Sequence, residues 1–384
     1  MNAKGLIVRG LAMVALTFGA AVAHAHERGT AYTMTNADND NQIVVLSRGD
    51  DGLLTRVDTV SSGGKGSGGG VDPLASQGSL VLVDEGAGHH GWRPHRGRFL
   101  GAGDGFHGRQ LLLGVNAGSN DVSVFGVHGD RLKLLDRVGS GGSFPVSVTV
   151  SDKMVYVLNN GAPANIAGFR LDGRGRMHPV PHSTRVLGEG DYGQVAFAPN
   201  GKVLVVTDKA NNRLLVYGVG RHGMPSEDPV VTPSAGAVPF GVDFDRRGHL
   251  LVVEAGANAV SSYNIAHNGS LQVISASVPN GQAATCWIVV TRRGAVLTTN
   301  PGTHSLSAFH VDARTGQVSL LNGAAGSGNA PLDIDVTERG RFAYAVDPGN
   351  GGVDMFRIEA DGSLTGLGTV DLGLMPYAQG MAVR

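Results

Sequence analysis

The chain has 384 residues, with 31 Lys and Arg against 32 Asp and Glu, 60 glycines and one cysteine. This balanced charge gives no reason to expect nucleic acid or an anionic membrane as a partner. The lone Cys286 excludes an internal disulfide. Frequent glycine beside few charged residues predicts many short strands joined by tight turns.

The N-terminus has the pattern of a secretory signal. Lys4 and Arg9 precede an apolar run from Leu11 to Val22, and Ala23-His24-Ala25 follows it. This order predicts a signal peptide over residues 1–25 and an exported mature chain, 26–384, either periplasmic or secreted. No later apolar run is long enough to span a bilayer.

An alternating segment that closes on an aromatic residue recurs along the chain. The residue nine positions before each aromatic is an amide or a carboxylate, and near the N-terminus the same shape, with one extra residue, runs from Asn36 to Leu46. The pairs are Asn116 with Phe125, Asn160 with Phe169, Asp208 with Tyr217, Glu254 with Tyr263, Asn300 with Phe309, and Asp347 with Phe356.

A second set of segments repeats with the same period. "FPVSVTV", "YGQVAF", "PFGVDF", "CWIVVT", "PLDIDV" and "PYAQGMAV" align at positions 145, 192, 239, 285, 331 and 376. A period of about 46 residues with short β segments is typical of β-propeller blades. The sequence therefore predicts an all-β, seven-bladed propeller with four-stranded antiparallel blades.

The two ends of the chain predict how the propeller closes. The first repeat begins at Thr30 with its second strand, and a spare first strand follows Pro376. Pairing the two would complete blade 1 and leave no open edge. The stretch "GGKGSGG" is expected to be a flexible crossing to blade 2, and residues from about 84 to 109 an insertion in that blade.

The turns between second and third strands should share one face of the disc, because antiparallel strands alternate direction. A ring of polar residues is therefore expected there: Asn36, Asn116, Asn160, Asp208, Glu254, Asn300 and Asp347. First-strand starts would add Phe144, Tyr192, Phe240, Cys286, Trp287 and Tyr377. The alternative is that Asn and Asp only stabilise turns through their own backbone.

Blades 4 and 5 supply the candidates for catalysis. Asp208 and Lys209 occur in "VVTDKANN" and Glu254 in "VVEAGAN". Such a set could act as base, oxyanion partner and acid. It could equally form an ion pair that fixes two blades. Cys286 is expected to be a small buried hydrophobe rather than a nucleophile.

The blade 2 insertion contains His89, His90, His95 and His107. Such a tract can bind Zn or Cu. Its spacing matches no recognised ligand pattern, and a disordered or partner-binding loop is favoured instead.

The stretches "LLLGVNAGSNDVSVFGV", "NGKVLVVTDKANNRLLVYGV" and "GGSFPVSVTVSDKMVYVLNNG" resemble the lactonase-type seven-bladed propellers. That family includes 6-phosphogluconolactonases and carboxymuconate lactonising enzymes. The family's enzymes tend to carry a His in the first strand of blade 4, where this chain has Tyr192 and Gln194. The expected export also separates this chain from cytoplasmic phosphorylated sugars.

Three hypotheses follow, and the sequence leaves open whether the protein is an enzyme. The first is an exported lactonase-like propeller that binds, and could hydrolyse, a small lactone or sugar acid in a central polar pocket without a required cofactor. The second is a non-catalytic propeller that presents its ring or His-rich loop to a ligand or protein. The third adds Ca held by Glu254, Asn300 and Asn160. A monomer is expected.

Overall fold

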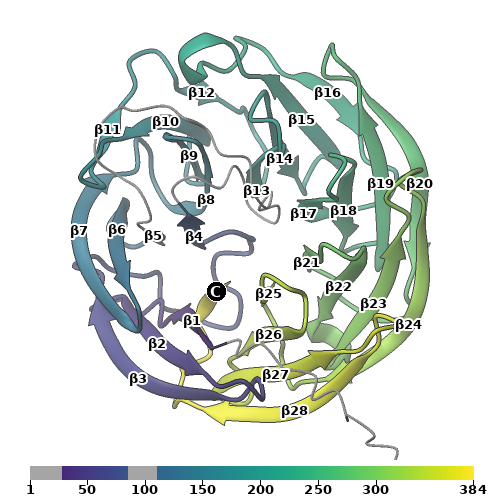
Figure 1. Cartoon of the computed structure of the whole chain (residues 1–384). Helices are drawn as coiled ribbons and strands as arrows, with labels where there is room; N and C mark the ends of the chain where they lie inside the picture. Colours follow the sequence, from purple (N-terminus) through teal and green to yellow (C-terminus); the bar gives the residue numbers. More distant parts are fainter. Residues whose placement is uncertain (1–27, 85–109) are drawn as a thin grey trace, which may run out of the picture.

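Seven β-sheets surround a central axis in the computed structural model, which describes residues 28–84 and 110–384 (Figure 1). The predicted seven-bladed propeller is therefore confirmed. The predicted signal peptide and the core of the blade 2 insertion fall in residues 1–27 and 85–109, outside the described part of the chain.

The strands follow in order from the axis outward. Blade 1 contains β29 (Gln379–Val383), β1 (Gly29–Met34), β2 (Gln42–Arg48) and β3 (Leu54–Ser61). Blade 2 contains β4 (Leu80–Asp84), β5 (Gln110–Asn116), β6 (Asp121–His128) and β7 (Arg131–Gly139). Blade 3 contains β8 (Pro145–Ser151), β9 (Met154–Asn159), β10 (Asn165–Leu171), β11 (Met177–Pro179) and β12 (Arg185–Val186). Blade 4 contains β13 (Tyr192–Phe197), β14 (Val203–Asp208), β15 (Arg213–Gly218) and β16 (Val230–Pro233).

The last three blades repeat the same order. Blade 5 contains β17 (Pro239–Phe244), β18 (Leu250–Glu254), β19 (Ala259–Ile265) and β20 (Leu271–Pro279). Blade 6 contains β21 (Trp287–Val290), β22 (Ala295–Asn300), β23 (Ser305–Val311) and β24 (Val318–Ser327). Blade 7 contains β25 (Ile334–Val336), β26 (Phe342–Asp347), β27 (Gly352–Ile358) and β28 (Leu364–Asp371). Two short 3₁₀ turns, Arg221–Gly223 and Pro301–Thr303, also occur.

Blade 1 closes the ring as the termini predict. Strand β29, from the C-terminal end, pairs antiparallel with β1, with Tyr32 opposite Ala382. The closure joins the two ends of the chain within one sheet, so blade 1 has no unpaired strand edge between β29 and β1.

The core lies between the blades. Second and third strands are buried along nearly their whole length, as in β9 and β6, because both faces of each sheet pack on neighbouring blades. The repeated aromatics fill these interfaces: Phe125 and Tyr263 are fully buried. Fourth strands such as β20 are mostly exposed or half-buried because they form the outer edge.

The disc has two different faces. We call the face with the turns between second and third strands the ring face, since it carries the polar ring predicted from the sequence. The other face carries the turns between first and second strands, and between third and fourth, and we call it the mouth face. No helix in the described part of the chain is long and apolar enough to cross a membrane.

The glycine-rich crossing from blade 1 to blade 2, expected to be flexible, is hydrogen-bonded to the ring face. Gly66 N donates to Ala37 O at 2.7 Å, and Gly118 N donates to Lys65 O at 2.9 Å. A β-carbon on Gly66 would lie 2.2 Å from the backbone of Asn36. Glycine is therefore needed for this close approach of two backbones.

Candidate functional site: the axial cavity

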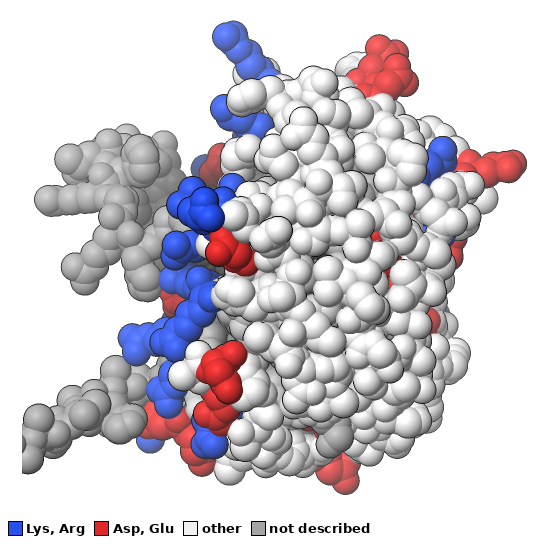
Figure 2. Space-filling model, turned by 90° about the vertical axis from the view of Figure 1, so that its right-hand side faces the viewer, with Lys and Arg blue, Asp and Glu red and all other residues white. Residues whose placement is uncertain are grey.

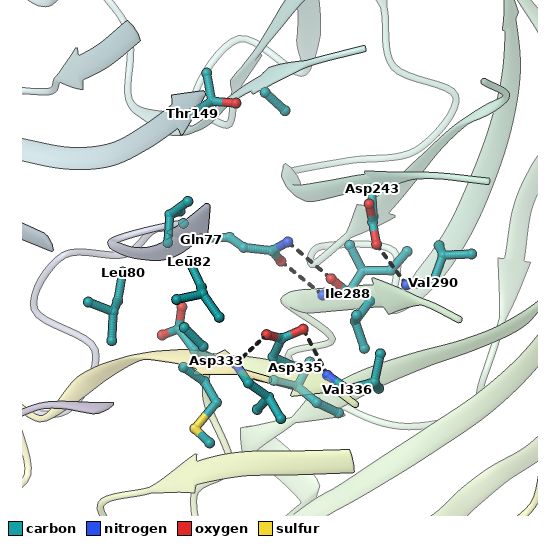
Figure 3. Close-up of a pocket in the computed structure, with 18 of the residues that line it drawn as sticks. Gln77, Leu80, Leu82, Thr149, Asp243, Ile288, Val290, Asp333, Asp335 and Val336 are labelled. Atoms are coloured by element: carbon teal, nitrogen blue, oxygen red, sulfur yellow. Dashed lines mark hydrogen bonds between the residues drawn. The ribbon is translucent and has the colours of Figure 1, made fainter. Parts of the chain in front are cut away.

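A cavity of about 210 Å³ lies on the propeller axis (Figure 3). Innermost strands of all seven blades line it: β4, β8, β13, β17, β21, β25 and β29. Valine is the most frequent residue of its lining, and isoleucine and leucine add to the apolar wall. The carboxyl groups of Asp243, Asp333 and Asp335 are the principal acidic groups beside the axis. The site thus combines an apolar wall with clustered carboxyls.

These carboxyls are held by backbone amides of the next blade. Asp243 Oδ2 accepts from Val290 N at 2.7 Å, and Asp335 Oδ2 accepts from Val383 N at 2.8 Å. Gln194 Oε1 binds the next blade in the same way. An innermost strand is a sheet edge whose outward N–H groups need partners. Side chains of the preceding blade supply them, and this fixes each carboxyl in place.

Burial changes the chemistry of two of these carboxyls. It raises the pKa of Asp243 to about 7, assisted by the nearby Asp335, although N–H groups of Val290 and Phe244 bind the carboxylate and lower it. Burial likewise raises the pKa of Asp333 to about 7, although the hydrogen bond from Gly380 N lowers it. Near neutral pH, the cavity can therefore contain both a carboxylate base and a carboxylic acid.

The crossing segment 72–78 closes the cavity at the ring face. Gln77 Nε2 donates to Val242 O at 3.3 Å and to Ile288 O at 3.0 Å, and Gln77 Oε1 accepts from Ile288 N at 2.9 Å. Trp287 Nε1 donates to Ser76 O at 2.9 Å. The segment thus bridges blades 5 and 6 from the end of blade 1, and Figure 3 shows Gln77 reaching across to Ile288.

The cavity opens at the mouth face. Its lining extends to Asp152, which is exposed, and to Arg292 and Glu338, which are half-buried. Arg292 Nη2 lies 3.3 Å from Glu338 Oε1. A ligand would therefore enter past this ion pair and meet the carboxyls deeper inside.

Two predicted catalytic carboxylates lie away from the cavity. Asp208 is fully buried and accepts from Asn211 and from Arg213 Nε, the latter at 2.7 Å. Glu254 is fully buried and accepts from Gly236 N at 2.6 Å, and also from Ser261 and Ser277. Neither lines the axial cavity. Glu254 joins strands of blade 5 to the connection from blade 4, whereas these bonds of Asp208 stay within blade 4.

The side chain of Lys209 points away from that of Asp208 and has different partners. Its Nζ lies 3.1 Å from Asp191 Oδ1, donates to Ala75 O and sits 5.1 Å from the centre of the Phe240 ring. Asn160 Nδ2 also donates to Asp191 Oδ1, at 3.0 Å. Asp191, a residue that the sequence analysis did not single out, therefore joins Lys209 to Asn160, and Lys209 in turn contacts Phe240. None of these contacts involves Glu254.

One position of the predicted ring needs correction. Asn159, at the end of β9, is the equivalent of Asn116, because it is fully buried and donates to Asn165 Oδ1 across the turn. The nine-residue count gives Asn160 because the turn in blade 3 is one residue longer: Asn159 pairs with Asn165, whereas Asn116 pairs with Asp121.

The other ring residues are buried and bonded beneath their turns. Asn36 Nδ2 donates to Tyr377 O at 3.1 Å. Asn116 Oδ1 accepts from Ser62, and Asn300 Oδ1 from Thr285. Asp347 Oδ1 accepts from Ala330 N at 2.8 Å. This network stabilises turns and connections, and these bonds reach other segments of the chain rather than the backbone of each residue's own turn.

The predicted first-strand residues are also largely inside the protein. Tyr192 is fully buried and its hydroxyl donates to Leu187 O at 2.7 Å. Phe240 and Trp287 pack edge to face, with ring centres 5.0 Å apart. Tyr377 and Phe144 are half-buried. Cys286 is buried, and burial raises the pKa of its thiol far above the ordinary value, which disfavours the reactive thiolate.

The predicted metal ligands do not come together in the described residues. Glu254, Asn300 and Asn160 bond to three different sets of partners, and the described part of the chain holds no group of three or more His, Cys, Asp or Glu arranged to bind a metal. His89, His90, His95 and His107 lie outside the described residues.

The sequence analysis missed the three aspartates of the cavity, although they occur in segments that it aligned. "PFGVDF" contains Asp243, and "PLDIDV" contains Asp333 and Asp335. Acidic residues at alternate positions of an otherwise apolar first strand are the sequence pattern that could have identified them. Such residues share one face of the strand, and that face lines the axis.

Comparison with known proteins agrees with this architecture. The sequence profile of the family described as "Lactonase, 7-bladed beta-propeller" matches residues 287–372, which correspond to blades 6 and 7. The resemblance to lactonase-type propellers is thus confirmed over these two blades. Among curated proteins, none matches the sequence.

Solved structures show the same fold over nearly the whole chain. A periplasmic gluconolactonase of Pseudomonas aeruginosa is 17% identical, with a TM-score of 0.63, and the match covers 93% of this chain and 99% of that one. A provisionally assigned 6-phosphogluconolactonase of Bacteroides fragilis is 16% identical, with a TM-score of 0.67 and coverage of 92% and 97%. A similarly assigned protein of Bacteroides uniformis is 14% identical, with a TM-score of 0.67 and coverage of 92% and 99%.

Proposed function

From a chain whose blades 6 and 7 match the lactonase propeller family, we propose that this protein is an exported hydrolase of small lactones of sugar acids. The observation that carries the proposal is the axial cavity with Asp243 and Asp333, whose pKa values burial raises to about 7. The names of the similar gluconolactonases support the substrate class. Export rests on the predicted signal peptide.

The size of the cavity favours a small substrate. At about 30 Å³ per water in the liquid, 210 Å³ corresponds to roughly seven waters. That volume suits a single unphosphorylated sugar ring. The valine and isoleucine walls would bury the ring, and the carboxyls would bind its hydroxyl groups.

The two carboxyls have complementary roles in the proposed hydrolysis. Asp243, as carboxylate, accepts a proton from water while the water oxygen attacks the lactone carbonyl carbon. The bond between that carbon and the ring oxygen then breaks, and Asp333, as carboxylic acid, donates a proton to the leaving oxygen. The products are the open hydroxy acid and an enzyme whose proton has moved from Asp333 to Asp243.

An assay of Asp243→Asn tests this role. Asn keeps an oxygen for Val290 N but cannot accept a proton, so kcat on sugar-acid lactones such as glucono-δ-lactone should fall about 100-fold or more. Hydrolysis by the unaltered protein should peak near pH 7 and fall on both sides, because it needs Asp243 ionised and Asp333 protonated and both pKa values are about 7. Proton release in a weakly buffered indicator assay measures both.

The controls separate this proposal from the alternatives. Asp354→Asn changes another buried carboxyl with a raised pKa, outside the cavity lining, and should keep activity. Loss of turnover in folded Glu254→Gln but not in Asp243→Asn would instead place catalysis at the ring. Inactivation by EDTA would favour the Ca hypothesis. Absence of turnover on every lactone would overturn the hydrolase and leave a binding propeller.

A further inference from the structure

Basic residues recur in the turns that surround the mouth of the cavity. Every described turn from a first to a second strand carries Lys or Arg, and in blade 1 the end of β29 and the start of β1 do so as well. These residues are Lys153, Lys202, Arg246, Arg247, Arg292, Arg293, Arg339, Arg341, Arg384 and Arg28. In the side view of Figure 2, Lys and Arg gather along one face of the disc.

The density is highest over blades 5, 6 and 7. Arg246, Arg247, Arg293 and Arg339 are all exposed, and we call these four residues the arginine rim. Within the described residues, no carboxylate forms an ion pair with any of the four guanidinium groups. They are available to an anion from outside.

The acidic residues in the turns that carry the arginine rim already have hydrogen-bond or ion-pair partners. Asp245 is buried, binds the backbone N–H groups of Arg247 and His249, and lies 2.7 Å from His249 Nδ1. Glu338 pairs with Arg292 at the cavity mouth. These carboxylates therefore shape the turns and compete little with an external anion for the arginine rim.

The ring face lacks such a concentration of charge. Its turns 117–120, 255–258 and 348–351 contain no Lys, Arg, Asp or Glu. A net charge of −1 over the whole chain thus coexists with basic residues in the mouth-face turns next to the axis, while the outer mouth-face turns between third and fourth strands carry acidic residues such as Asp130, Asp312 and Asp361. This arrangement can steer an anionic partner to the cavity side of the disc.

We propose that the arginine rim binds an acidic polysaccharide through its carboxylate or sulfate groups. Arginine suits this role because its planar fork binds such groups in a bidentate manner. The exposed large apolar side chains at the described mouth face, such as Leu53 and Val230, are scattered singly, so insertion into lipid is disfavoured. Aromatic residues near the mouth, Phe197, Phe244 and Phe342, are buried, which disfavours stacking of nucleic-acid bases.

Binding of the full-length protein to immobilised polygalacturonate and dextran sulfate tests the proposal, with neutral dextran as the reference surface. The rim variant Arg246→Gln/Arg293→Gln/Arg339→Gln removes one cation from each of three neighbouring turns. The control variant Arg56→Gln/Lys65→Gln/Lys133→Gln removes the same charge from exposed positions outside the mouth face. No lactone turnover is required, so the result is independent of the proposed hydrolase activity.

The unaltered protein should bind one of the acidic polysaccharides but not dextran, and added salt should weaken the binding. The rim variant should bind roughly tenfold or more weakly, while the control variant should stay within about twofold of the unaltered protein. Failure of the unaltered protein to bind either polymer would overturn the proposal. Equal losses in both variants, or tighter binding to anionic vesicles or single-stranded DNA than to either polymer, would also overturn it.

Discussion

At the scale of single residues, the position of a carboxyl along its strand determines its chemistry. Glu254 ends a second strand and is enclosed by donors, whereas Asp243 lies in a first strand and lines the axial cavity. The first kind of carboxyl is stabilised by its bonds and has no room for a substrate. The second accepts fewer bonds and shares a cavity with other acids, so its proton affinity rises.

Buried Asp333 should make stability depend on pH. Its pKa is about 7 in the folded protein against 3.8 as the ordinary value, so the folded state binds more protons than the unfolded state between these values. Its contribution is therefore fully present below pH about 4, is lost as pH rises through about 7, and amounts to at most about 4 kcal/mol. Asp72 and Asp243, also raised, act in the same direction.

Thermal unfolding of Asp333→Asn measures this effect. The unaltered protein should have a higher Tm at pH 5.5 than at pH 8, and the variant should show a smaller difference, because Asn can still accept from Gly380 N but does not titrate. Asp361→Asn is the control, since that exposed carboxyl has a lowered pKa and stays ionised across the range. An unchanged pH dependence in Asp333→Asn would contradict the assignment.

At the scale of elements, the innermost strands and the crossing segment 72–78 form one unit. First strands bind each other through side chains such as Asp243 and Gln194 rather than through a shared sheet. The crossing segment ties blades 5 and 6 together across the axis through Gln77 and Ser76. It thereby limits the cavity to a single opening at the mouth face.

Gln77→Ala should therefore destabilise the protein. The substitution removes three hydrogen bonds and leaves Ile288 N without its partner, which should lower the free energy of unfolding by about 2 kcal/mol. Urea denaturation gives the value. Gln317→Ala, at an exposed position, should change it by less than about 0.5 kcal/mol. Equal stability of the two variants would show that the bridge contributes little.

At the scale of the whole molecule, the closure of the ring bears on its stability, and the distribution of charge bears on which partners it can bind. Closure depends on a short C-terminal strand, β29, which pairs with β1 and also supplies backbone N–H groups to Asp333 and Asp335. The charge distribution places Lys and Arg in the turns around the cavity mouth, whereas most turns between second and third strands on the ring face carry no charged residue. These properties concern all seven blades together.

Removal of residues 376–384 should open the propeller. The truncated chain loses the innermost strand of blade 1 and exposes the buried edge of β1, so its unfolding transition should broaden or disappear, with aggregation. Removal of Arg384 alone is the control and should leave a cooperative transition. Circular dichroism on heating, with hydrogen exchange of β1, distinguishes the two. A cooperative transition in the longer truncation would show that closure is dispensable.

The sequence by itself determined the number of blades, their strand order and the pairing of the two termini. Strand period, turn residues and repeat length can all be recognised from the order of residues along the chain, without knowledge of contacts between distant segments. It also indicated polar ring positions, with a shift of one residue at Asn160 because a longer turn in blade 3 cannot be seen in a fixed count. The resemblance to lactonase-type propellers came from the same local patterns.

Only the tertiary structure decided which polar residues face a cavity. Glu254 and Asp243 look alike in the sequence, but strand position buries one among donors and exposes the other to the axis. The closing role of Gln77 depends on contacts with residues 165 and 211 positions away. The basic turns around the cavity mouth were hidden by a balanced total charge, because composition sums over both faces and only the alternation of strand direction separates them.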